Sequence, residues 1–204
     1  MASGAFAGGI DPKKALLLAP LASSTASLVF GWDQHLFLSL LTAAPHGEAV
    51  LPGYWRALFP RGVAQVLALL SVTAGASAGA AWAHGGLLRR TGSLGWYAAA
   101  GVLALGHLGF VPAVAGRIRD LLERADGEGA AAGAGAGLGD VNQKGVEGEE
   151  GEEGENGEEK KEEKSSKSNV ELQREWLQIN LVRTLTTDLG AWVCAFVAAV
   201  KTFS

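Results

Sequence analysis

The residues best suited to chemistry are four side chains spaced along an apolar stretch near the C-terminus. Trp176, Asn180, Arg183 and Thr187 recur at four- and three-residue intervals, so on a helix, where each residue advances about 100°, they share one face. Guanidinium and carboxamide groups can offer a fixed set of hydrogen-bond donors to an anion or to the oxygens of a planar aromatic molecule. We expect these four residues to bind a substrate. Alternatively, Arg183 extends to a membrane interface or braces its helix.

Three further side chains could move protons. His107 lies in the middle of another apolar stretch, where it acts either as a proton carrier near neutral pH or as a hydrogen-bonding group between helices. Asp188 lies about 120° around its helix from the Asn180 and Arg183 face, so we expect it to serve another neighbour, either His107 or His35. We therefore take His107, His35 and Asp188 as the candidate catalytic residues.

Four long apolar runs must position these side chains. The chain has 204 residues, of which 48% are hydrophobic and 19% charged, and its apolar residues gather in runs of nearly the ~20 residues that a membrane-spanning helix needs. The runs are 16–30, with a continuation towards 41, then 62–83, 94–114 and 181–200. A soluble bundle would show polar positions every three or four residues, and the second and third runs show almost none. The sequence predicts an all-α, four-helix transmembrane bundle.

Composition divides the chain into three parts. Residues 1–125 hold three predicted spans, residues 126–168 form a Gly-, Glu- and Lys-rich acidic segment, and residues 169–204 hold the fourth span. The segment between Asp126 and Ser168 carries thirteen acidic and five basic residues and no aromatic residue, so we expect a disordered, solvated loop. The first run follows Lys13 and Lys14, as in a signal peptide, but its continuation to residue 41 favours a retained helix.

The connections between spans carry their own signals. The segment 42–61 combines Tyr54, Trp55 and Arg56 with three prolines, which is typical of a loop that anchors at the membrane interface; the alternative is a lid over a pocket. Residues 84–92 read as a short basic turn. Four spans place both termini on one side, but with five basic residues on one side and seven on the other the positive-inside rule gives no orientation.

Several classes of function find no support. Cys194 is the only cysteine and the four histidines are not at ligand spacing, so we expect neither a disulfide framework nor a metal site. The glycine-rich tract lacks the strand, helix and lysine of a phosphate-binding loop. We expect no cofactor and no nucleic acid. The expected partners are membrane lipids and a hydrophobic aromatic small molecule, with self-association open, and an endomembrane location is favoured.

Two motifs point to a known family. The stretch LPGYWRALFPRG (51–62) and the W-x3-N-x2-R pattern of Trp176, Asn180 and Arg183, within four spans, resemble the DUF1772 integral membrane proteins, whose fungal members include the anthrone oxygenases of aromatic polyketide secondary metabolism. The resemblance implies a monooxygenase that converts an anthrone-like phenol to a quinone with O2 and without flavin, haem or metal. A base, His107 or His35, would remove a proton, and Arg183 and Asn180 would hold the phenolate oxygens.

A second hypothesis comes from another class. The chain is then a non-catalytic membrane protein that binds a lipid or hydrophobic metabolite, or that acts as a scaffold in the membrane. A four-helix transporter ranks third, since no repeat or charged ring is visible. A catalytic site predicts that His107, Arg183 and Asn180 converge on one cavity, whereas a scaffold predicts that each polar group is paired separately in a tightly packed bundle.

Overall fold

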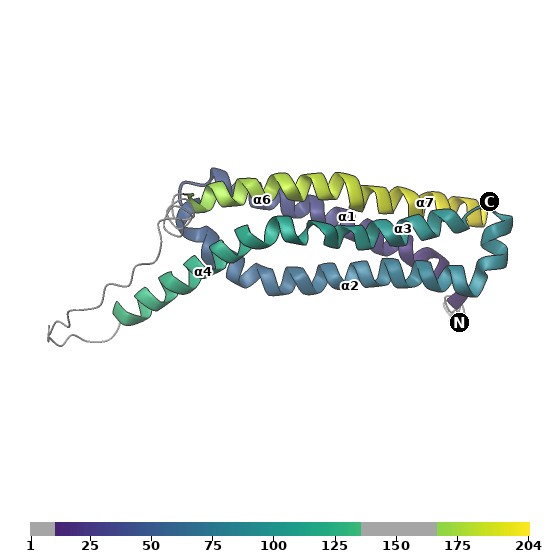
Figure 1. Ribbon diagram of the computed structural model, residues 1–204, viewed down its shortest axis with the longest axis horizontal. Helices are drawn as coiled ribbons and strands as arrows, with labels where there is room; N and C mark the ends of the chain where they lie inside the picture. The colour runs from purple at the N-terminus through teal and green to yellow at the C-terminus, as the bar shows by residue number, and fades with distance from the viewer. Residues whose placement is uncertain (1–10, 136–166) are drawn as a thin grey trace, which may run out of the picture.

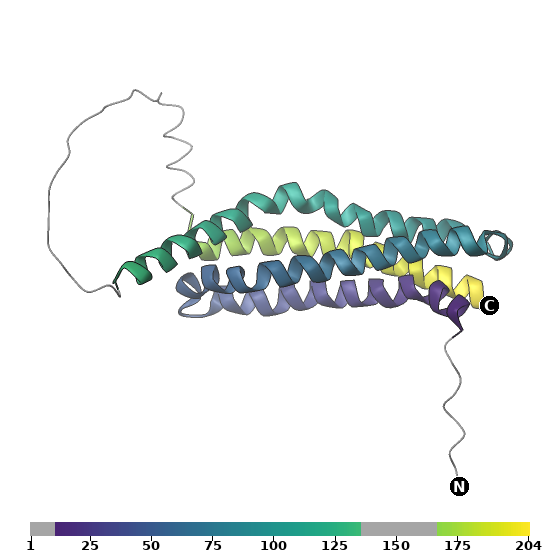
Figure 2. The same ribbon diagram turned by 90° about the horizontal axis from the view of Figure 1, so that it is seen from below.

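The computed structural model describes residues 11–135 and 167–204. Its elements are α1 (Pro12–Ala43), α2 (Gly47–Arg90), α3 (Leu94–Gly106), the 3₁₀ turn η1 (His107–Phe110), α4 (Val111–Gly135), α6 (Asn169–Arg183), the π-helical turn η2 (Thr184–Asp188) and α7 (Leu189–Phe203). The elements α3, η1 and α4 are consecutive along the chain, with no linker residue between them, and so are α6, η2 and α7. The described chain therefore forms four long helical rods, which pack side by side (Figures 1 and 2).

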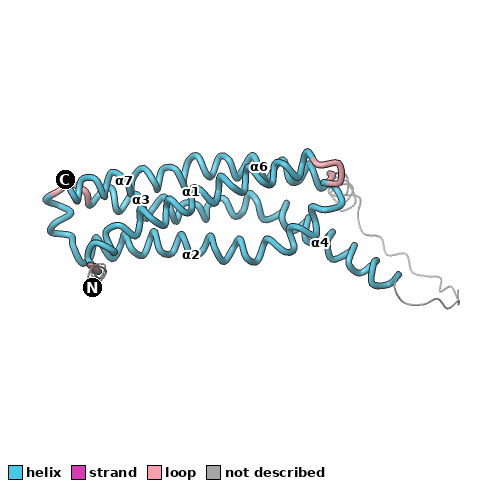
Figure 3. The backbone as a smooth tube through the Cα atoms, turned by 180° about the vertical axis from the view of Figure 1, so that it is seen from behind, coloured by secondary structure: helices cyan, strands magenta, loops and turns pink. Residues whose placement is uncertain are grey.

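The predicted all-α, four-helix architecture is confirmed. Each rod contains a stretch long and apolar enough to cross a membrane, and the residues described contain no strand. Only short connections join α1 to α2 and α2 to α3 (Figure 3). The start of α1, the turn between α2 and α3, and the C-terminus lie at the same end of the bundle (Figure 1). The expectation that both termini share one side of a membrane stays a prediction.

The second helix is much longer than expected, because most of the segment 42–61 is helical. The linker between α1 and α2 is confined to residues 44–46. Pro52 lies inside α2 and cannot donate to the carbonyl of Glu48 four residues earlier, but the side chain of Asn169 donates to that carbonyl at 2.9 Å instead. Trp55 is buried and donates to Gln173, so the expectation that it anchors at a membrane interface was wrong.

Helices α2 and α4 also end later in the chain than expected. Helix α2 continues through a kink at His84 to Arg90, and the chain reverses at Gly92, whose φ of 66° suits glycine. Helix α4 extends to Gly135, past the boundary expected at residue 125. The rest of the expected disordered loop, residues 136–166, lies outside the described residues. Helix α6 begins at a capping box between Ser168 and Glu171, as its sequence pattern favours.

The bundle is longer than a bilayer is thick. At 1.5 Å per residue, the 44 residues of α2 extend about 66 Å, about twice the ~30 Å of a hydrocarbon layer. Ion pairs gather at the end where α6 begins, where Arg117 lies 2.8 Å from Glu175 and Lys167 lies 2.7 Å from the same carboxylate. We call this the polar end. Arg183 lies about 30 Å along its helix from Phe203, a length about equal to the thickness of a hydrocarbon layer.

Two apolar clusters form the core. One lies at the polar end, where Trp55 and Trp176 meet edge to face with ring centroids 5.0 Å apart among buried leucines. The other, at the opposite end, includes Leu17 and Tyr97, and the Tyr97 hydroxyl donates to the Leu17 carbonyl at 2.8 Å. Between the clusters lies a group of buried polar side chains, which includes His107 and Asp188.

Candidate functional site

A break in the third rod places His107 at the centre of the bundle. Pro112 has no N–H, so the carbonyl of Leu108 cannot accept the usual helical bond from it, and the N–H of Val111 bonds to Leu108 instead. The turn at His107–Phe110 is accordingly 3₁₀. The rod bends outward near this turn (Figure 2), as helices commonly do next to a proline.

A second break, in the fourth rod, brings Arg183 and Asp188 together. In a regular α-helix, residues five apart point about 140° away from each other. Here Thr184–Asp188 form a π-helical turn, which widens the helix so that residues five apart lie closer to one face, and such turns are frequent at functional sites. Asp188 Oδ2 lies 3.6 Å from Arg183 Nε. The expectation that Asp188 serves a different neighbour from Arg183 was therefore incomplete, because it assumed a regular helix.

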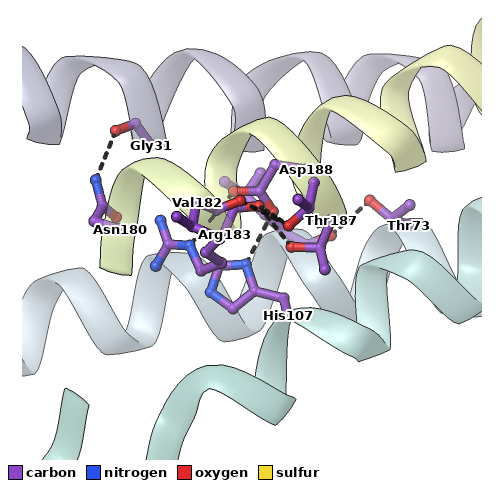
Figure 4. Close-up of polar contacts among 10 residues, drawn as sticks. Gly31, Thr73, His107, Asn180, Val182, Arg183, Thr187 and Asp188 are labelled. Carbon is purple, nitrogen blue, oxygen red and sulfur yellow. Dashed lines mark hydrogen bonds and ion pairs between the residues drawn. The ribbon is translucent and has the colours of Figure 1, made fainter. Parts of the chain in front are cut away.

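Of the two partners expected for Asp188, the structure shows His107 and not His35. His107 Nδ1 lies 2.9 Å from Asp188 Oδ1, and the two side chains are 7% and 2% exposed (Figure 4). In the tautomer with the proton on Nδ1, His107 donates this hydrogen bond to the Asp188 carboxylate, and Nε2 carries the lone pair. Asp188 thus faces a histidine on one oxygen and an arginine on the other.

His107 and Arg183 also line a common cavity of about 420 Å³, a volume within the usual range for small-molecule sites. Most of its wall is aliphatic or aromatic and comes from α2 and α4, with Trp55 and Trp176 among the lining residues. Gln34 of α1 is a further polar residue of the wall, and Arg119 lies at the polar end. The cavity combines an apolar body with a few polar side chains, as sites for hydrophobic ligands do.

The other expected site residues have different surroundings. Asn180 is buried and donates to the Gly31 carbonyl at 3.2 Å, so it joins α6 to α1 and is absent from the cavity wall. Thr187 bonds to the Arg183 carbonyl of its own helix at 2.9 Å. The His35 ring lies tilted beside that of Trp32, with ring centroids 6.2 Å apart, and does not line the cavity. Of the three residues expected to converge, His107 and Arg183 do so and Asn180 does not.

Two further residues shape this region. Gln34 is a polar residue in an apolar run, which makes it a candidate for a functional site from the sequence alone, but the sequence assigns it no role. Gly31 is required by close packing: a Cβ there would lie 2.7 Å from Thr184 Oγ1 and 3.3 Å from Asp188 Oδ2. Nothing in the sequence around Gly31 reveals that contact, since it joins residues more than 150 positions apart.

The polar end fixes α4 against α6. Besides the two ion pairs of Glu175, Arg124 donates to the side chain of Asn169 at 2.7 Å, and the Glu48 carboxylate accepts from the first two amides of α6. An acidic group at a helix N-terminus accepts hydrogen bonds from the free N–H groups and interacts favourably with the positive end of the helix dipole. These contacts hold the far end of the cavity together. Within residues 11–135 and 167–204, no three His, Cys, Asp or Glu side chains gather as a metal site would require.

Comparison with known proteins gives three matches. A sequence profile described as anthrone oxygenase matches residues 55–193, which is more than half of the chain. The epoxidase gkaX of Penicillium citrinum is 29% identical over 199 residues, which cover 91% of this chain and 93% of that protein. The epoxidase pydX of an Acremonium species is 25% identical over 194 residues, which cover 93% and 95%. No solved structure matches the chain.

Proposed function

This chain belongs to the anthrone oxygenase family, and on that premise we propose that it is a multi-pass membrane enzyme that oxidises an electron-rich phenol with O2. The family and its epoxidase relatives support an oxidative enzyme in general. The narrower proposal, an anthrone-like substrate converted to a quinone, is carried by one observation: His107, bonded to Asp188 through Nδ1, lines an apolar cavity together with Arg183.

The proton transfer falls to His107. With Nδ1 bound to Asp188, Nε2 is the free basic atom, and a carboxylate partner stabilises the imidazolium that forms when Nε2 takes a proton. The proton comes from the methylene carbon of the anthrone, or from the phenol tautomer, and leaves an electron-rich anion with its charge on the ring oxygen. The Arg183 guanidinium stabilises that oxyanion.

The anion then reacts with O2 itself. Electrons pass from the carbanion to O2, a C–O bond forms, and the hydroperoxide takes up a proton; loss of water from the hydroperoxide yields the ketone. The balance is one CH2 group and one O2 giving one C=O and one H2O, with no other reductant. The protein's contribution is to bind the ring system, to remove the proton and to stabilise the negative charge.

The relatives named epoxidases favour a second candidate reaction. Epoxidation of a carbon–carbon double bond by O2 uses one oxygen atom and needs two electrons and two protons to release the other as water. A hydroquinone can supply both, and the products are then a quinone epoxide and water. This reaction also begins with a phenol that loses a proton beside a cation, so the same His107 and Arg183 would serve it.

The test follows O2 uptake and product in membranes that contain the protein. Wild type is compared with His107→Gln and with His46→Gln, a matched change at an exposed histidine outside the cavity. We expect one O2 per anthrone or hydroquinone, a loss of about 10²–10⁴-fold in His107→Gln and no loss in His46→Gln. Mass spectrometry with ¹⁸O2 separates the quinone from the quinone epoxide. Tight binding of these ligands without turnover would instead support the non-catalytic, metabolite-binding alternative.

A further inference from the structure

The cavity reaches the surface of the bundle beside the bend in the third rod. Residues before and after that bend form one wall and residues of α2 form the facing wall. Four aliphatic residues of these walls are also between 39% and 50% exposed: Val63 and Leu67 of α2, Leu108 of η1 and Val111 of α4. His107, in the same wall, is only 5% exposed. We call the four exposed residues the cavity mouth, because the cavity extends from them to the buried histidine.

The mouth lies within the apolar runs of the chain. Its two residues of α2 belong to the run 62–83, and the other two belong to the run 94–114. Both rods contain a stretch long and apolar enough to span a membrane. Aliphatic side chains exposed at such positions are stable against lipid tails, whereas a patch of this kind is unfavourable in water. The mouth therefore suits contact with hydrocarbon.

The polar end of the cavity is different, because ion pairs join the helices there. Arg56 of α2 lies 3.1 Å from Asp126 of α4, and Arg117 of α4 lies 2.8 Å from Glu175 of α6. An apolar ligand that entered from this end would pass between charged side chains or displace these pairs. At the mouth it would meet only aliphatic groups, which form neither hydrogen bonds nor ion pairs.

A mouth of this kind also selects its ligand. A charged molecule loses its hydration in hydrocarbon without gaining a partner, so the ligand must arrive uncharged. A lipid tail is uncharged too, but it has no polar atom for His107 and Arg183, which lie in the inner wall of the cavity. A planar aromatic molecule with an oxygen on its ring matches both the aliphatic mouth and the polar inner wall.

We infer that the cavity opens sideways into the hydrocarbon layer between α2 and the third rod, and that it takes an uncharged, planar aromatic ligand directly from the bilayer. The inference rests on the proposed function in that it treats this cavity as the substrate site. It adds the phase that supplies the ligand, and it excludes ligands with a permanent charge. The negative charge of the reaction then forms only inside the cavity, beside Arg183.

Spin labels on the full chain test where the mouth lies. Cys194→Ala removes the single cysteine, and Val63→Cys or Val111→Cys then gives one labelling site on each side of the mouth. Val72→Cys on α2 and Val102→Cys on α3 are the matched controls, because both valines are exposed and absent from the cavity wall. Each labelled protein in lipid bilayers is probed with O2, which concentrates in hydrocarbon, and with a water-soluble nickel(II) chelate.

The ligands are anthraquinone, which is uncharged, and anthraquinone-2-sulfonate, which has the same rings and a permanent charge. We expect O2 to relax all four labels more strongly than the nickel chelate does. Anthraquinone should remove about half or more of the O2 collisions at positions 63 and 111, because a ligand in the mouth fills the space beside the label. Positions 72 and 102 should not change, and the sulfonate should change none of the four.

A label that obstructs the mouth is recognised by a separate binding measurement. Anthraquinone quenches tryptophan fluorescence when it binds, since Trp55 and Trp176 line the cavity, and empty bilayers correct for partitioning. Loss of binding with labels at positions 63 and 111, but not at 72 and 102, would support the same conclusion.

Three results would overturn the inference: stronger relaxation by the nickel chelate at positions 63 and 111, binding of anthraquinone without any change at these positions, or equal shielding by the sulfonate. Turnover provides an independent result. If the labels at the mouth respond as expected while wild type oxidises no phenol, entry from the bilayer stands and the proposed reaction fails. If wild type turns over while the nickel chelate reaches the mouth, the reaction stands and the lateral opening is refuted.

Discussion

The contacts of Asp188 lead to a prediction that separates stability from catalysis. Asp188→Asn keeps the shape of the side chain and removes the charge that faces Arg183 at 3.6 Å. Two unit charges at that separation attract by about 4–5 kcal/mol at an effective dielectric constant of 20. Removing one partner of a buried ion pair typically costs ~3–5 kcal/mol. Because Arg183 lines the cavity and water can reach it there, we expect a smaller loss, about 2–3 kcal/mol.

A second variant tests that reasoning directly. Arg183→Met in the Asp188→Asn background removes the cation left without its carboxylate, so the double variant should be more stable than Asp188→Asn alone. It should recover most of the loss, to within about 1 kcal/mol of wild type, as non-additivity between contacting residues allows. Activity should not recover, because His107 still lacks the carboxylate that fixes its proton and the oxyanion lacks Arg183. For the single variant we expect kcat to fall by about 10²–10³-fold.

The assay uses the single cysteine of the chain. Cys194 lies on α7 and is partly buried, so a thiol-reactive fluorescent dye reports unfolding on heating. Asp126→Asn is the matched control, because the Asp126 side chain is 67% exposed in its ion pair with Arg56 and should change the melting temperature little. A double variant no more stable than Asp188→Asn would refute the coupling between Arg183 and Asp188. Full activity in Asp188→Asn would refute the role of the His107 pair.

Three other substitutions have defined outcomes. Gly31→Ala places a methyl group 2.7 Å from Thr184 Oγ1, so we expect a loss of about 1–3 kcal/mol from overpacking, measured by the same thermal assay; wild-type stability would contradict this contact. Glu48→Gln removes the charge that caps α6 and should cost about 0.5–2 kcal/mol, a loss that shrinks at high salt if the dipole contribution is real. Pro112→Ala restores the N–H that the bend at His107 lacks, so the helix should straighten, the melting temperature rise and anthraquinone binding weaken; unchanged binding would mean that the bend does not shape the cavity.

The sequence by itself determined the class of fold. Runs of about twenty apolar residues without polar interruption admit a membrane-spanning helix and almost nothing else, so four spans were predictable without any contact information. It also indicated which residues are candidates for chemistry. Ionisable side chains such as those of His107, Arg183 and Asp188 cost free energy inside a membrane-spanning run, so their presence points to a function. The start of α2 was less predictable, because the helix continues through Pro52. Pro52 has no N–H, and the side chain of Asn169 in α6 donates to the Glu48 carbonyl in its place.

Only the tertiary structure decided which polar residues act together. Helix spacing assigns a residue to a face, but the π-helical turn at Thr184–Asp188 rotates Asp188 towards Arg183, and no spacing rule for a regular helix contains that rotation. The choice of His107 over His35, and the separation of Asn180 from the cavity, depend on which helix lies opposite each face. Gln34 of α1 and Arg183 of α6 line one cavity for the same reason. The sequence states which side chain stands at each position. Which of these side chains meet in one cavity depends on how helices that are distant along the chain pack against one another.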